Sequence, residues 1–180
     1  NSEISTQSIE IHNLISFVRS IKQTPELFFL KKIFKIKGYI IADVKLEFDY
    51  EGNIKDNFTA RGFIKDTKLK LLKEHQIDNI NFVFNLKKED LIIDDINFSF
   101  NKLDFKSEKI SSVKEKDGFT ISGNIDNNDI ELNQKNIDLF TKNLFPNLNI
   151  KKLKFISNNN FIIKIDEKFK LKDTYIDSKI

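Results

Sequence analysis

The sequence predicts a mainly β (α+β) fold: a curved antiparallel β-meander that forms a half-open groove, with an N-terminal helical segment and one short internal helix. Three observations predict it. Apolar and polar residues alternate with a period of two over most of residues 38–132, polar links with occasional glycine separate the alternating runs, and two segments change to helical spacing.

The N-terminal residues 1–35 are predicted to be a helical segment. From Ile9 to Ile21 apolar residues recur at steps of three to five, as on one face of a helix. Thr24-Pro25-Glu26 then begins a second short helix, because proline is favoured in the first turn.

Residues 36–135 are predicted to be a β-meander groove unit. It opens with a hairpin over residues 39–64, in which Glu51-Gly52-Asn53 supplies the turn. The apolar residues of its first strand share one parity and the charged residues share the other, so one face of the hairpin is expected to leave water. Further strands are expected at residues 67–72, 79–86, 91–93, 96–100, 102–107, 118–125 and 129–133.

The apolar parity slips at Asp94-Asp95, where odd positions give way to even ones. One extra residue there predicts a β-bulge, which bends the sheet and keeps the apolar side chains on one face. A second slip near Asn101-Lys102 returns the parity to odd, so we expect a curved sheet.

Residues 136–147 are predicted to form a short helix, which Pro146 ends. Alternation resumes over residues 148–180, which we interpret as the start of a second β unit, the chain being a fragment of a longer protein.

The strand runs and their Gly and Asp punctuation resemble a known repeating unit. The stretches are "ADVKLEFDYEGNIKDNFTARGFIKDTKLKL", with Gly62-x-Ile64, "IDNINFVFNLKKEDLIIDDINFSFNKLDFKSEKI", and "GFTISGNIDNNDIEL", with Gly123-x-Ile125. Over roughly residues 36–133 this order is similar to the unit of the AsmA-like family of bacterial envelope proteins, which includes the YhdP and TamB types and is related to the bridge-like lipid-transfer proteins.

The resemblance implies a function and a location. Members are anchored in the inner membrane and reach across the periplasm, where an apolar β-groove shields phospholipid acyl chains between the inner and outer membranes. The expected partners are therefore phospholipid and, through parts of the protein outside this chain, the two membranes. A groove of this kind needs no specific contact, because each buried methylene is worth about 0.8 kcal/mol.

The residues expected to line this lipid groove are the apolar side chains of one parity. They are Ile40, Val44, Leu46, Phe48, Phe58, Ile64, Phe82, Phe84, Ile93, Phe98, Phe100, Phe119 and Ile121. The alternative is a closed core beneath the two helical segments, in a structural or adhesive β-repeat domain that binds protein partners through its edge strands.

The sequence lacks the residue patterns typical of nucleic-acid binding, catalysis and metal binding. The 30 basic and 27 acidic residues leave a net charge of +3, and Arg19 and Arg61 are the only arginines, so no nucleic-acid partner is expected. No enzyme activity is predicted, because His12 and His75 have no accompanying nucleophile and there is no cysteine. The run "DNNDIE" at residues 126–131 lacks the glycine and spacing of a calcium loop, so no metal and no cofactor are expected.

Overall fold

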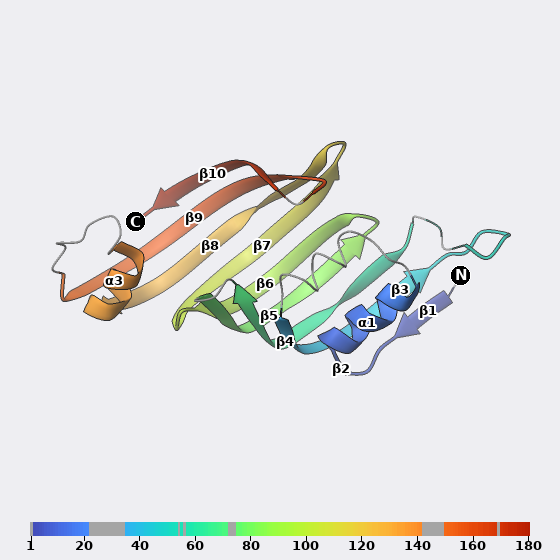
Figure 1. Cartoon of the computed structure of the whole chain (residues 1–180), viewed down its shortest axis with the longest axis horizontal. Helices are drawn as coiled ribbons and strands as arrows, with labels where there is room; N and C mark the ends of the chain where they lie inside the picture. The colour runs from blue at the N-terminus through green and yellow to red at the C-terminus, as the bar shows by residue number, and fades with distance from the viewer. Residues whose placement is uncertain are drawn as a thin grey trace.

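The computed structural model describes residues 2–21, 35–53, 55, 57–71, 75–141, 150–168 and 170–180. Within these ranges ten strands form one antiparallel sheet (Figure 1). In chain order the elements are β1 (Ser2–Ser5), β2 (Ile9–Glu10), α1 (Ile11–Ile21), β3 (Lys35–Leu46), β4 (Thr59–Leu71), β5 (His75–Lys87), β6 (Asp90–Phe100), β7 (Leu103–Glu115), β8 (Gly118–Asn133), α3 (Gln134–Thr141), β9 (Lys152–Asp166) and β10 (Leu171–Lys179).

The sheet is open and curved, which confirms the predicted mainly β meander. From β3 onward each strand pairs with the strand that follows it in the chain, and β1 and β10 form the two outer edges. Short β2 pairs with β3 beside β1. Two-residue links join β5 to β6, β6 to β7 and β7 to β8 as hairpins, whereas α3 lies between β8 and β9.

The cross-strand register divides the sheet into two faces, because directly opposed residues point to the same side. One such row runs from Ala42 in β3 through Gly62, Phe84, Ile93, Ile110, Gly123 and Phe161 to Ile176 in β10. The next row runs from Ile4 through Val44, Ala60, Leu86, Leu91, Ser112, Ile121 and Ile163 to Thr174. We call the side that bears these rows the apolar face.

The predicted bulge at Asp94-Asp95 is confirmed. Asp95 has a φ of 53°, and Ile93 and Ile96 stay on one face because they oppose Ile110 and Ser107. Both strands of this pair carry an extra residue there, so the pairing remains in step. Register shifts recur in the pairs β3–β4, β4–β5, β5–β6, β7–β8 and β8–β9, and this repetition accounts for the curvature.

The second expected parity slip is a hairpin turn. Asn101 and Lys102 join β6 to β7 with φ values of 51° and 69°, the two positive values of a type I′ turn. Phe98 and Phe105 consequently oppose each other on the apolar face, with ring centroids 5.5 Å apart.

Both described helices pack on the apolar face, toward opposite ends of the sheet (Figure 1). Ile11 of α1 lies on Ile40, Ala42 and Phe84, all buried. Ile137 of α3 is 2% exposed and packs with Ile130 and Leu132 of β8. Each described helix therefore covers a few strands, and no other described helix lies on the apolar face.

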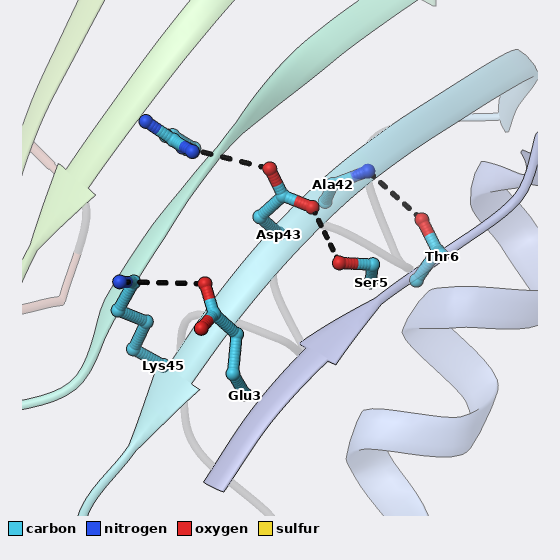
Figure 2. A network of polar contacts seen from close by, with 7 residues as sticks. Glu3, Ser5, Thr6, Ala42, Asp43 and Lys45 are labelled. Atoms are coloured by element: carbon cyan, nitrogen blue, oxygen red, sulfur yellow. Dashed lines mark hydrogen bonds and ion pairs between the residues drawn. The ribbon is translucent and has the colours of Figure 1, made fainter.

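The N-terminal segment differs from the prediction for residues 1–35. Ser2–Ser5 and Ile9–Glu10 are strands, and the helix is Ile11–Ile21; the second predicted helix falls in residues 22–34, outside the described ranges. β1 is held to β3 by side chains as well as backbone (Figure 2): Ser5 Oγ donates to Asp43 Oδ1 at 2.7 Å, and Thr6 Oγ1 accepts from the backbone amide of Ala42 at 2.8 Å. These partners are nearly 40 residues away, which local periodicity does not detect.

The later segments extend the same sheet. Residues 148–180, interpreted as the start of a second β unit, contribute β9 and β10, and β9 pairs with β8. The short helix predicted at 136–147 begins earlier, at Gln134, and is described as far as Thr141; residues 142–149 lie outside the described ranges.

Candidate functional site

The apolar face is a continuous feature of the described sheet that extends from β3 to β10. Eleven of the predicted lining residues lie on it: Ile40, Val44, Leu46, Ile64, Phe82, Phe84, Ile93, Phe98, Phe100, Phe119 and Ile121. Nine of them are half-buried, so no described element seals these positions completely.

Ile40 and Phe84 occupy a different environment from the other nine. They are 7% and 9% exposed because α1 lies over them. They belong to a small packed core, against which Ile64 and Phe82 also pack.

Phe48 and Phe58 do not lie in regular strands of the sheet. β3 ends at Leu46 and β4 begins at Thr59, so both aromatic residues fall in the connection between these strands. Asp49 organises that connection, because its Oδ1 accepts from the amides of Glu51 and Asn53 at 2.9 and 2.8 Å. The hydrogen bonds from Asn53 hold the pKa of Asp49 below its ordinary value.

Several apolar-face residues were not singled out from the sequence. They are Leu86, Leu91, Ile110, Phe161, Ile163 and Ile165. Leu91 and Ile110 sit between strands already identified, and the odd parity of Phe161, Ile163 and Ile165 was a usable signal. Placing them required the register, which joins residues 161–165 to residues 119–123.

Among the described residues, four buried polar side chains lie on the apolar face, all near the register shifts. They are Thr67, Ser107, Asn127 and Ser157. Asn127 is 0% exposed; its Oδ1 accepts from the amide and hydroxyl of Ser157, and its Nδ2 donates to the carbonyl of Phe155 at 3.2 Å. The carboxamide thus replaces backbone pairing where the β8–β9 register shifts between Asn127 and Ile130.

A five-residue motif accompanies two of the bulges. "DNINF" (78–82) and "DDINF" (94–98) each place a positive φ at the second residue, Asn79 or Asp95, and a buried isoleucine at the third. The side chain of the fourth residue hydrogen-bonds to the carbonyl of the second. Asn81 Nδ2 donates to the carbonyl of Asn79 at 2.8 Å, and Asn97 Nδ2 donates to the carbonyl of Asp95 at 3.4 Å. The bulge at Asn79 was missed, although this likeness to residues 94–98 could have revealed it.

Charged residues are almost absent from the apolar face. Among the side chains that the structure describes in β3 to β10, the cross-strand register places one Lys, Arg, Asp or Glu there, Lys114. Its Nζ lies 4.3 Å from the centroid of the Phe119 ring.

The opposite face carries the charges and a shallow polar hollow. Asp43 pairs with Arg61 at 3.5 Å, and Glu131 with Lys152 at 2.9 Å, which lowers the pKa of Glu131. The hollow is lined by Glu108, Lys109, Ser111, Ser122, Gly123, Asn124, Asn158 and Asn160. Its side chains hydrogen-bond to one another, as between Ser111 and Ser122 at 3.0 Å, and none forms a nucleophile–base pair.

The opposite face is not uniformly polar. Ile41, Phe63 and Val83 form one cross-strand row on it and are 38–48% exposed.

No catalytic or metal constellation occurs in the described part of the chain. No group of three or more His, Cys, Asp or Glu residues there is placed to hold a metal ion. His12 is exposed on α1, and the side chain of His75 lies outside what the structure describes. None of the described helices is both long and apolar enough to cross a membrane.

Comparison with known proteins gives no match: no family model, no curated protein and no solved structure resembles the chain significantly.

Proposed function

We propose that this chain is a non-enzymatic lipid-handling segment whose apolar face shields acyl chains from water. The single observation that carries the proposal is the half-buried apolar face between α1 and α3. Its rows continue across eight strands, from β3 to β10, and the register of the described residues places one charged side chain, Lys114, among them.

Acyl chains suit such a surface physically. An uncovered apolar face is costly in water, and each methylene that it removes from water contributes about 0.8 kcal/mol. Ile93, Ile110 and Phe161 lie in one cross-strand row. Their side chains have no hydrogen-bond donors or acceptors, so an acyl chain can slide over them.

In its finer form the proposal follows the family resemblance. The chain would be one segment of an AsmA-like protein, anchored in the inner membrane, that conducts phospholipid across the periplasm to the outer membrane. The open curved sheet and its apolar face support that assignment.

The test uses two adjacent isoleucines that point to opposite faces. Ile163 opposes Ile121 on the apolar face and is half-buried, whereas Ile162 opposes Ser122 on the other face and is 42% exposed. Ile163→Asp should weaken binding of a phospholipid with labelled acyl chains by at least about tenfold, because it places a carboxylate beside the chain. Ile162→Asp is the matched control and should bind as the unchanged protein does.

Circular dichroism of both variants verifies that the sheet persists. Equal affinity in the two variants, or no lipid retained by the unchanged protein in native mass spectrometry, would contradict the proposal.

A second candidate function rests on the outer edge of β10. Leu171, Tyr175 and Ile176 are 61–66% exposed, and β10 has no further strand beside it within the described residues. An exposed edge strand can pair with a protein partner, as a structural or adhesive β-repeat would. Tyr175→Lys should then abolish self-association in sedimentation experiments; a chain that is monomeric before the substitution contradicts self-pairing.

A further inference from the structure

Lys114 is the one charged side chain that the cross-strand register of the described residues places on the apolar face. In β7, the apolar face receives Ile110, Ser112 and Lys114 in succession, and the lysine is the last of them before the turn into β8. An alternating strand would place an apolar or small residue at this position, so the ammonium group calls for an explanation.

The side chain is held on the face rather than directed away from it. Lys114 lies directly opposite Phe119, and its Nζ is 4.3 Å from the ring centroid. The same row continues to Ile165 and Leu171. The ammonium group therefore lies beside aromatic and aliphatic side chains at one end of the apolar face.

Within the described residues, no carboxylate forms an ion pair with Lys114. The ion pairs of the described residues involve Lys45, Lys55, Arg61, Lys68, Lys152 and Lys154. Asp90 lies near, but its Oδ1 accepts from the backbone amide of Lys114, at 3.3 Å. The ammonium group thus has its aromatic contact and retains the capacity to bind an anion.

We propose that Lys114 binds the anionic head of an acidic lipid, a carboxylate or a phosphate, whose acyl chain lies on the apolar face. This inference rests on the proposed function and adds a ligand class and an orientation to it. Successive same-face positions along a strand are about 7 Å apart. From Lys114 the chain would pass Ser112 and Ile110, beside Ile121 of β8 and Ile93 of β6.

The test compares three ligands that share the same hydrocarbon chain and differ in their head group: oleate, oleyl phosphate and oleyl alcohol. Lys114→Gln should weaken binding of the two anions by about tenfold and leave oleyl alcohol unchanged, because the variant keeps the apolar floor and loses the charge. Lys114→Arg should restore binding of the anions.

Lys164→Gln is the matched control. Lys164 opposes Thr120 on the opposite face and is exposed, so its loss removes an equal charge without touching the proposed site. A reduction for either anion that is confined to the Lys114→Gln variant supports the inference and identifies the preferred head.

The outcomes separate the two proposals. If Lys114→Gln binds all three ligands as the unchanged protein does, the head-binding role is wrong while the lipid-shielding face stands. If the unchanged protein binds none of the three, the proposed function itself fails.

Discussion

The ring of Phe84 lies over Gly62, its direct partner across β4 and β5. A Cβ added at Gly62 would come within 2.9 Å of Phe84 Cε1 and 2.2 Å of the backbone oxygen of Ile41. The glycine therefore lets an aromatic ring and two backbones approach closely beneath α1.

Gly62→Ala should lower the free energy of unfolding by about 3 kcal/mol, because backbone atoms must move to admit the methyl group. Gly52→Ala is the control, since nothing lies within 4 Å of a Cβ there and only the φ of +86° opposes the change. It should cost about 1 kcal/mol. Urea unfolding measures both, and equal losses would contradict the close approach at Gly62.

Asn127→Ala should destabilise the sheet by about 2–3 kcal/mol. The substitution leaves the amide of Ser157 and the carbonyl of Phe155 without their side-chain partner at a fully buried position. Asn124→Ala, which removes a half-buried hydrogen bond to Asp126 on the opposite face, should cost less than about 1 kcal/mol. Thermal unfolding of the Asn127→Ala and Asn124→Ala variants shows whether the Asn127 side chain stabilises the bulge more than an ordinary surface amide would.

The left-handed backbone at Asp95 predicts an asymmetric response to substitution. Its φ is 53°, so Asp95→Val should lower stability by about 1–2 kcal/mol, whereas Asp95→Gly should change it little. Asp94→Val, at the neighbouring position with ordinary φ, provides the comparison. A valine tolerated at residue 95 as well as at residue 94 would show that the bulge does not form in solution.

The turn between β9 and β10 should weaken in acid. Asp166 Oδ1 accepts from the amides of Lys170 and Lys168 at 2.8 Å each, and these bonds, that of Lys170 first, hold the pKa of Asp166 below 3.8. A carboxyl whose pKa is lowered by folding stabilises the fold above its unfolded pKa and loses that contribution as pH falls through the folded one.

The corresponding comparison is Asp166→Ala against the unchanged protein. The difference in stability should be full at pH 6 and should shrink as the pH falls below about 3.8. Urea titrations of both proteins at pH 6 and at a pH below about 3.8 measure this difference in stability. A difference independent of pH would mean that the carboxylate does not organise this turn.

The extent of sequence-based prediction follows from the range of the contacts involved. Alternation over two residues is local, so the strands, their apolar side and the bulge at Asp95 could be predicted. The burial of Phe84 could not, because it depends on α1, some 70 residues earlier in the chain. The strand Ser2–Ser5 was missed for the same reason, since it is polar and its partners lie at residues 43–46.

The candidate site shows the same division. Ile93 and Ile121 were placed on the apolar face from parity alone, but Phe48 and Phe58 lie outside the regular strands, because β3 ends at Leu46 and β4 begins at Thr59. Lys114 was not identified because the expected strand ended at residue 107, whereas β7 continues to Glu115 and its register sets Lys114 against Phe119.

The linear strand order has a kinetic consequence. Because each strand from β4 onward pairs with the strand before it in the chain, most strand pairs can form next to an existing hairpin. The β8–β9 pair must first close the connection of residues 134–151, which contains α3. Such a ribbon should also fray inward from β10, shedding its outermost strands while the part clamped by α1 keeps its amide protons shielded from exchange.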